Sequence, residues 1–129
     1  MENKDYSVAI ESTSRELTVK EKIQLPDLAD AVRLDEAVQP DAPLIIDVDA
    51  VVVLAIHNEK AKEDKDYNTI VILAKDGTKY STSSYNVYNA IDNIVNACIE
   101  GGVTDYSIKV LKRESNNYKG KYFLTATIA

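Results

Sequence analysis

The amino-acid sequence predicts a mainly β domain of the α+β class, with the element order β-β-β-α-β-β, preceded by an arm with one short helix. Three observations predict it. Apolar and polar residues alternate along residues 44–57, the dipeptide Asp76-Gly77 separates two β-rich segments, and apolar residues recur at helical spacing over residues 85–100. Alternation with period two is typical of a strand, Asp-Gly of a tight hairpin, and a period near 3.6 of a helix.

The arm occupies residues 1–43 and precedes a domain of residues 44–129. The beginning of the arm carries scattered apolar residues, which indicate a loose arm or an isolated strand. Residues 26–38, PDLADAVRLDEAV, indicate the short helix, because Pro26 suits a first turn and apolar residues follow at helical spacing. Two prolines come next and disfavour helix in the residues before them, so the domain boundary is placed there.

The strand over residues 44–57 is the clearest element of the domain. Its even-numbered residues are all apolar, whereas Asp47 and Asp49 are among the odd-numbered ones. Side chains alternate between the two faces of a strand, so the even residues are expected in a core. A charged loop is expected over residues 58–66.

The second and third strands are expected over residues 67–75 and 78–82, on either side of the Asp-Gly turn. Either Ser83 or Ser84 can cap the helix that follows. The helix is expected to end at the Gly-Gly pair after it, because glycine accepts the left-handed conformation.

The last two strands are expected over residues 104–113 and 118–128. In the final strand Tyr122 and Leu124 share one face, which leaves Phe123 on the other face beside lysines. A bulge would reset this register and place Phe123 in the core instead. The pattern alone leaves both arrangements open.

Three strands, one helix and a hairpin are the element order of the OB-fold, a five-stranded, partly open Greek-key barrel. The first strand is long enough to bend and serve both halves of the barrel, and the helix would close one end. The loops over residues 57–66 and 113–118 would then flank the binding face. A small α+β sandwich with the same order is the rival fold.

Charge is unevenly distributed along this chain of 129 residues, whose formal net charge is −6. Residues 1–43 hold five basic and ten acidic residues, whereas residues 109–121 hold five basic residues and Glu114 alone. A partner experiences the local field rather than the global charge. The alternative is that the basic residues only keep a hairpin soluble.

Several classes of protein do not fit the sequence. No run of about 18 apolar residues could span a membrane, and the first residues lack the apolar region of a signal peptide. The single cysteine, Cys98, cannot form an internal disulfide, which indicates a reducing cytoplasm.

Catalytic and metal-binding patterns are missing as well. His57 has no cysteine or second histidine at ligand spacing, and Asp47 and Asp49 have no visible third ligand. Ser83 and Ser84 have no partnering base, and there is no glycine-rich phosphate loop. We therefore expect no enzyme, no metal and no cofactor.

OB-folds that bind single strands combine a positive groove with aromatic side chains on which bases stack. Phosphates require cations, and bases require flat faces. The candidate phosphate contacts are Lys79, Lys112, Arg113, Lys119 and Lys121. The candidate stacking side chains are Tyr67, Tyr80, Tyr118 and Phe123.

Two stretches, KDGTKYSTSSYNVYNAIDNIV over residues 75–95 and NNYKGKYFLTATI over residues 116–128, carry a family resemblance. They resemble the small single-stranded-DNA-binding proteins of phages and conjugative plasmids of Gram-positive bacteria, over roughly residues 44–129. The resemblance implies an OB-fold, sequence-independent binding of single strands, no cofactor and no catalysis. By position it implies DNA contacts from Tyr118, Lys119, Lys121 and Phe123.

We therefore expect a protein that coats single-stranded DNA during replication or transfer of a phage or plasmid, in the cytoplasm of a bacterial host. RNA, replication or transfer proteins, and a second copy bound through the arm are further candidate partners; a membrane is not. The alternative is a non-enzymatic protein-interaction module, such as a phage inhibitor or adaptor, that acts through its acidic surface. Residues 1–43 could cover the basic groove or recruit partners.

Overall fold

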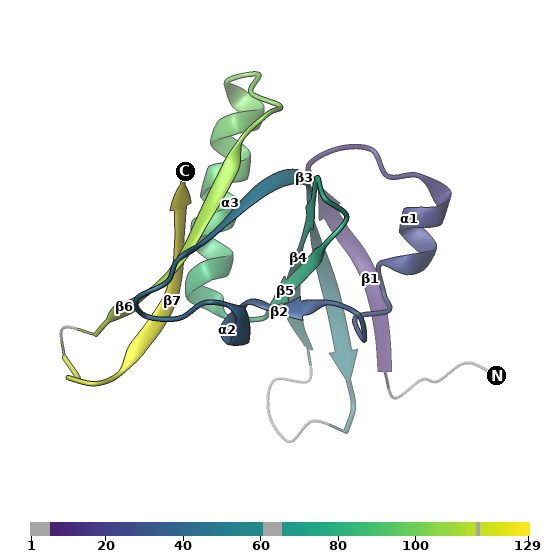
Figure 1. Ribbon diagram of the computed structural model, residues 1–129. Coiled ribbons are helices and arrows are strands. Elements are labelled where there is room, and N and C mark those ends of the chain that lie inside the picture. The colour runs from purple at the N-terminus through teal and green to yellow at the C-terminus, as the bar shows by residue number, and fades with distance from the viewer. Residues whose placement is uncertain (1–5, 61–65, 116) are drawn as a thin grey trace.

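The structure is a computed structural model that describes residues 6–60, 66–115 and 117–129. Within these residues the chain forms a seven-stranded sheet and three helices (Figure 1). The strands are β1 (Tyr6–Thr13), β2 (Val32–Arg33), β3 (Leu44–Asn58), β4 (Asp66–Ala74), β5 (Lys79–Thr82), β6 (Ser107–Glu114) and β7 (Tyr122–Ile128). The helices are α1 (Val19–Gln24), α2 (Leu34–Ala37) and α3 (Tyr85–Glu100).

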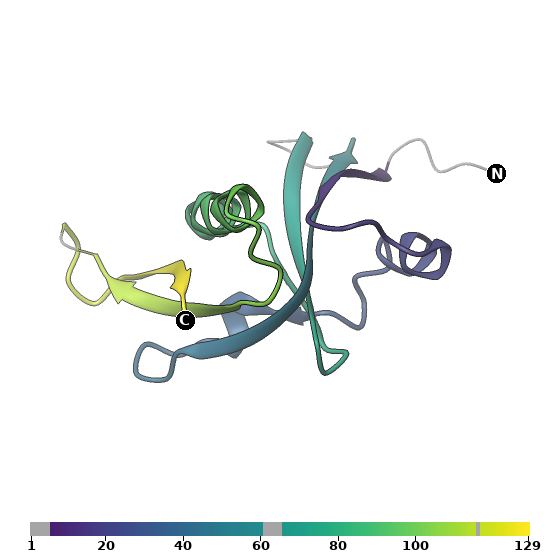
Figure 2. The same ribbon diagram turned by 90° about the horizontal axis from the view of Figure 1, so that it is seen from above.

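The long strand β3 holds the sheet together. Its beginning pairs with β6, its remainder pairs with β4, and its second half also pairs with β1. The hydrogen-bonded order is β2-β5-β4-β3-β6-β7, with β1 beside β3. Figure 2 shows β3 bending across the molecule, so that the sheet curls into a half-barrel with α3 on its inner side.

A bulge at Asp49 changes which residues of β3 face the inner side. The pairing with β4 shifts register between Val48 and Ala50, and an inserted residue reverses the alternation of side chains. Even residues therefore pack into the inner core before the bulge, and odd residues do so after it. The residues concerned are Ile46, Val48, Val51 and Val53.

A second core lies on the opposite face of β3 and β4. The even residues of β3 after the bulge, such as Val52 and Leu54, meet Leu17 and Leu25 there. The two leucines come from the acidic first third and are 6% and 1% exposed. The even residues of β3 are thus buried as predicted, but they serve two cores. Burying a leucine side chain contributes about 1.5–3 kcal/mol, so this part of the first third packs on the sheet and is no loose arm.

Helix α3 has the bounds that its periodicity predicts. Its buried residues are Val87, Ile91, Val95 and Cys98. Spacings of four and three place them on one stripe, which faces the inner core. Gly102 adopts a left-handed conformation with φ of 71° after the helix, and the N–H of Val103 donates to the carbonyl of Cys98 at 2.8 Å.

The predicted hairpin turn joins β4 to β5. Gly77 has φ of 93°, a conformation that favours glycine, and the carboxylate of Asp76 accepts a 2.9 Å hydrogen bond from the N–H of Thr78. That bond lowers the pKa of Asp76. The later strands β6 and β7 are also present, although both begin a few residues after their predicted starts.

The helix predicted over residues 26–38 is wrong. The chain forms α1 before this segment, where Thr18 and Glu21 make a reciprocal capping box. The segment itself contains the short strand β2, which pairs in parallel with β5, and the single turn α2. Leu34 of α2 is fully buried in the inner core. A short helix is marginal in water, so pairing and burial determine the conformation here.

The five-stranded barrel is matched only in part. The five strands after residue 44 adjoin one another as β5-β4-β3-β6-β7, and their curl is consistent with an OB-like half-barrel. β1 and β2 raise the strand number to seven. In the described part of the chain β7 pairs with β6 alone, while β5 takes β2 as its second neighbour. The domain division at residue 43 remains a prediction, and most of the predicted loop 58–66 lies outside the described residues.

Candidate nucleic-acid interface

The hairpin of β6 and β7 has one face toward α3 and one face toward solvent. Its register runs without a shift from Ile108 opposite Ile128 to Glu114 opposite Tyr122. Opposed residues of an antiparallel pair share a face, and that face alternates along the strands. Val110 and its neighbours on the same face pack into the inner core. The alternate residues therefore point outward.

Five outward side chains form a continuous surface across three strands, and we call them the outer hairpin face. Ile45 of β3 is opposed to Lys109, and Arg113 is opposed to Phe123. Ile45 is 60% exposed and Phe123 is 38% exposed. The members are Ile45, Lys109, Leu111, Arg113 and Phe123.

The position of Phe123 resolves the two arrangements that its sequence context leaves open. Because β6 and β7 pair without a bulge, Leu124 and Ala126 face the inner core and Phe123 faces outward. The Arg113 side chain lies at the opposed position of β6, where cross-strand side chains are in contact range. A cation and an aromatic ring are thereby adjacent on one exposed surface.

The turn of the hairpin brings further predicted residues next to this surface. Tyr118 is 65% exposed, and the Nζ of Lys121 lies 5.8 Å from the centre of its ring, within cation–π range. Gly120 has φ of 81°, and the N–H of Lys121 donates to the carbonyl of Tyr118 at 3.2 Å. Lys119 is exposed in the same turn. Residues 117–121 of this turn thus present two ammonium groups and a ring.

Four cations of the hairpin form no ion pair with a described residue, unlike several cations elsewhere in the protein. Ion pairs occupy Arg15, Lys75 and Lys79, whose acidic partners include Glu21, Asp49, Asp105 and Asp30. Among the described residues no ion pair forms with Lys109, Arg113, Lys119 or Lys121. The nearest carboxylate of the turn, Glu114, accepts from the N–H of Gly120 at 3.3 Å, so the exposed cations outnumber it and attract an anionic partner.

Lys112 lies apart from these cations, although the sequence groups it with Arg113. Its side chain is on the opposite face of β6, and its Nζ donates to the backbone carbonyl of Asp35 at 2.8 Å. The lysine thus ties β6 to α2. The strand alternation explains this, because adjacent residues of a strand point to opposite faces.

The candidates on β4 and β5 are not brought together with the hairpin turn. The Nζ of Lys79 donates to the carboxylate of Asp30 at 3.0 Å and to the backbone carbonyl of Asp27 at 2.9 Å. The bond to Asp30 lowers the pKa of that carboxyl. The lysine side chain is only 13% exposed. Tyr80 packs against the inner core and Tyr67 against the second core. Lys79 therefore holds the acidic segment on the sheet.

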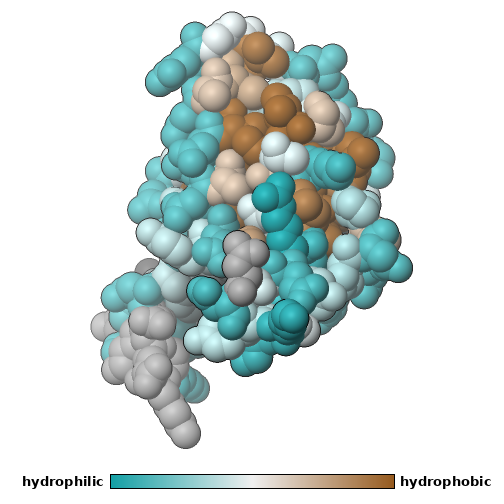
Figure 3. All heavy atoms as spheres, turned by 90° about the vertical axis from the view of Figure 1, so that its left-hand side faces the viewer, coloured by the Kyte–Doolittle hydropathy of each residue, from teal (hydrophilic) through white to brown (hydrophobic). Residues whose placement is uncertain are grey.

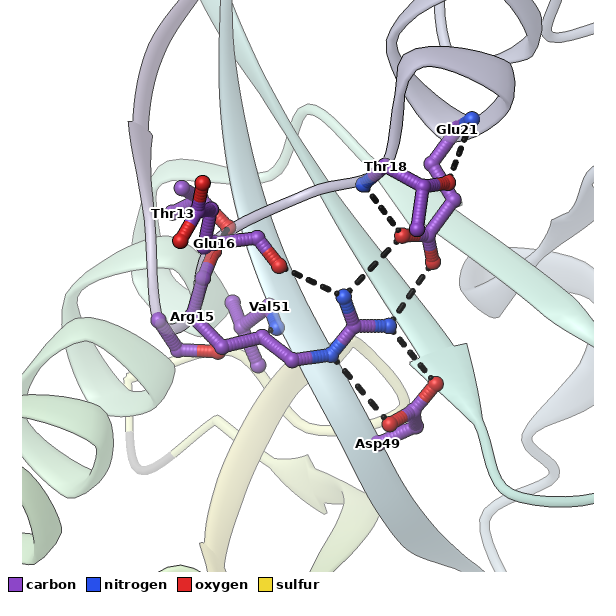
Figure 4. A network of polar contacts seen from close by, with 8 residues as sticks. Thr13, Arg15, Glu16, Thr18, Glu21, Asp49 and Val51 are labelled. Carbon is purple, nitrogen blue, oxygen red and sulfur yellow. Dashed lines mark hydrogen bonds and ion pairs between the residues drawn. The ribbon is translucent and has the colours of Figure 1, made fainter.

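A network around Arg15 anchors the same acidic segment to β3 (Figure 4). The guanidinium contacts Glu21 at 2.7 Å and Asp49, at the bulge of β3, at 2.9 Å. The hydrogen bonds from Arg15 and from the backbone of Thr18 lower the pKa of Glu21 to about 2. The two carboxylates in turn raise the pKa of Arg15. The Thr-x-x-Glu spacing is a capping-box signal that sequence reasoning could have used.

Sequence reasoning also missed three members of the outer hairpin face. Ile45, Lys109 and Leu111 were not singled out as contacts. Alternation along residues 107–113 places Lys109 and Leu111 on the face of Arg113, so that signal was available. Ile45 had no such signal, because only the pairing of β3 with β6 places it beside Lys109.

The side of the molecule that carries the hairpin combines apolar and hydrophilic areas. Figure 3 looks at this side and shows apolar atoms gathered above a hydrophilic lower region. Strand β7 contributes Tyr122, Phe123 and Ile128 to the exposed large apolar side chains. A surface of this composition provides flat apolar contacts next to charge.

Metal chemistry has no visible basis in the described ranges. They contain no group of three His, Cys, Asp or Glu side chains that could hold an ion. The Nδ1 of His57 lies 2.6 Å from the carboxylate of Asp66, and its Nε2 lies 3.3 Å from that of Glu59. The pKa of His57 is raised, mainly by the hydrogen bond with Asp66. No helix in the described part of the chain is long and apolar enough to cross a membrane.

Comparison with known proteins gives one family. The model of the family described as phage single-stranded DNA-binding protein matches residues 12–129. A search of curated proteins and a search of solved structures each find no match. The match extends beyond the predicted domain into the acidic first third. The family is one of phage proteins, so the resemblance to plasmid proteins stays a prediction. The chain belongs to the phage single-stranded DNA-binding protein family.

Proposed function

We propose that this protein coats single-stranded DNA without sequence preference during replication or transfer of phage DNA, and that the outer hairpin face and the adjoining turn form its contact surface. Membership in the family supports single-stranded DNA as the ligand. The observation that carries the site is the opposed pair of Arg113 and Phe123 on an exposed face, where Arg113 forms no ion pair among the described residues.

The chemistry of a single strand matches this surface. Each phosphate carries a negative charge, and a cation that neutralises it releases counterions to the solvent. Each unpaired base exposes two flat faces, and stacking on an aromatic ring tolerates every base. Arg113, Lys119 and Lys121 are placed for the phosphates, and Phe123 and Tyr118 for the bases. In a duplex the bases are already stacked, so only the phosphate contacts remain.

The proposed activity is binding alone. No catalytic step is assigned to any side chain, and no cofactor is needed for stacking or for phosphate contacts. Because backbone and stacking contacts are insensitive to base identity, the protein should cover any sequence that is exposed during replication.

The acidic first third receives a separate role in this proposal. Its segment 15–25 is held on the second core by Leu17 and Leu25, and it leaves Val19 and Ile23 of α1 at 73% and 72% exposure. These side chains favour a contact with a replication protein or a second copy. The same feature favours the alternative function, an interaction module that acts through its acidic surface.

Fluorescence anisotropy of a labelled oligo-dT tests the function. We expect saturable binding at low salt, weaker binding at moderate salt, and far weaker binding to a duplex of the same length. Equal affinity for duplex and single strand would contradict the stacking contacts. No binding to either ligand at low salt would remove the proposed function and favour the interaction module.

A further inference from the structure

A pocket lies between the start of β4 and the first turn of α3, apart from the outer hairpin face. Its volume is about 310 Å³, at the lower end of small-ligand pockets. Three tyrosines from two elements line it, together with three polar residues. They are Tyr67, Tyr85, Tyr88, Asp66, Asn68 and Ser83.

The tyrosines give the pocket one fixed wall and one open wall. Tyr85 and Tyr88 are three residues apart in α3, so they lie on the same side of the helix. Tyr88 is half-buried against the inner core, and this burial raises its pKa. Tyr85 is 75% exposed at the start of the helix. Most of this ring is not covered by the fold, which leaves it accessible to a flat ligand in the pocket.

The polar lining is already engaged in the protein and is therefore rigid. The amide of Asn68 donates to Glu11 at 3.0 Å and to the carbonyl of Leu54 at 3.2 Å. The hydroxyl of Ser83 is 2.7 Å from that of Thr69. These contacts hold the pocket open without a ligand.

The charge of the pocket selects the base of a nucleotide rather than its phosphate. Among the described residues Asp66 is the only charged group in the lining, and no described lysine or arginine contributes to it. A phosphate would be repelled, while an uncharged aromatic base can stack on the tyrosine rings.

A second pocket of about 470 Å³ adjoins the first and shares Tyr67 and Ser83 with it. Arg33 lines this second pocket together with Ser81 and Thr82, and Asp35 is the acidic residue in its lining. The Arg33 side chain is 69% exposed, and its contact with Glu36 at 3.8 Å is long. A phosphate next to the tyrosine pocket can therefore reach a cation and hydroxyl donors.

We infer that the pocket of Tyr67, Tyr85 and Tyr88 takes one nucleobase of the bound single strand, with an adjoining phosphate at Arg33. The inference rests on the proposed function and adds a second contact point to the outer hairpin face. Figure 1 shows the hairpin turn, the first turn of α3 and the start of β4 all at the lower end of the molecule. One strand that crosses this end meets both points, which lengthens the stretch of DNA that one protein covers.

Photocrosslinking of the full chain to an oligonucleotide with 5-iododeoxyuridine locates the bases. Trypsin separates the two regions, because cleavage after Lys79 and Lys109 releases residues 80–109 and cleavage after Lys121 releases residues 122–129. We expect cross-links at Tyr85 or Tyr88 in the first peptide in addition to the hairpin peptides. Cross-links confined to the hairpin would overturn the inference and leave the proposed function intact. Absence of binding would remove the proposed function itself.

Substitution of Tyr85 provides the second measurement. Its exposure and the high helix propensity of alanine make Tyr85→Ala compatible with folding. We expect roughly a 5- to 100-fold loss of oligo-dT affinity and a shorter occluded site, since stacking of one base is lost. Tyr85→Phe should bind like the unsubstituted protein. Ile99→Ala, exposed at the other end of α3, is the matched control. Equal affinity of Tyr85→Ala and the control would overturn the inference.

Discussion

Arg113 and Phe123 stand directly opposite each other on β6 and β7, on the face of the hairpin that is turned away from α3. Their positions follow from two simple features of the chain. The hairpin pairs without a bulge, and its inner face carries the apolar residues that pack on α3. An acidic protein thereby presents a cation and an aromatic ring side by side.

Removing the ring should weaken stacking without changing the electrostatics of binding. We expect Phe123→Ala to lower the affinity for oligo-dT by about 1–3 kcal/mol and to leave the salt dependence unchanged. Titrations at several salt concentrations measure both quantities. Thr127→Ala, exposed further along β7, serves as control. A changed salt slope in Phe123→Ala would contradict the assigned role.

Removing the cation should have the complementary effect. We expect Arg113→Ala to lower affinity and to reduce the slope of log K against log salt by about 0.7, the value for one phosphate contact on a single strand. Lys112→Ala is the neighbouring control, because Lys112 contacts the carbonyl of Asp35 instead. If Lys112→Ala reduced the slope as much as Arg113→Ala, the assignment by strand face would be wrong.

The acidic first third should contribute to the stability of the sheet. We expect Leu25→Ala to lower the free energy of unfolding by about 2–5 kcal/mol, because it leaves a cavity in the second core. Ile23→Ala, two residues away and 72% exposed, should change it by less than about 0.5 kcal/mol. Urea unfolding measures both. Equal effects would mean that the segment is not packed on β3 and β4.

The contact between Arg15 and Glu21 should make stability depend on pH. The pKa of Glu21 is about 2 in the folded protein, below the ordinary value of about 4.3 in an unfolded chain. Its contribution is thus complete above about pH 4.5 and is lost as the pH falls toward 2. Glu21→Gln should lower stability at pH 7 and differ less from the unsubstituted protein at pH 3, where part of the contribution is already lost. A difference that is the same at both pH values would exclude this linkage.

The elements with strong periodicity were predictable from the sequence. The alternation of residues 44–57 identified β3, and the helical spacing identified α3 with its ends. The Asp-Gly turn followed from an equally local rule, whereas the sequence pattern leaves the position of Phe123 open and the pairing of β6 with β7 places it outward. In these segments the buried residues repeat with the period of the element, so every buried position supports the same prediction of strand or helix.

The remaining features depend on contacts between distant residues. Residues 26–38 do not form the expected helix, because the burial of Leu34 and the pairing of β2 with β5 determine their conformation. The bulge at Asp49 created two cores from one alternating strand. Ile45 joined the outer hairpin face only because β3 pairs with β6. The spacing of apolar residues within one segment does not show which distant segments pair.

The central claim is that the cations of the hairpin, rather than positive charge in general, bind the strand. The chain offers a charge-matched comparison, because Lys20 and Lys22 of α1 are exposed lysines two residues apart, like Lys119 and Lys121. Both double substitutions to alanine change the net charge equally. We expect the hairpin double variant to lose on the order of tenfold in oligo-dT affinity at low salt and about 1.4 in salt slope, while the α1 double variant binds normally. Equal losses in the two variants, or none in the hairpin variant, would contradict the claim.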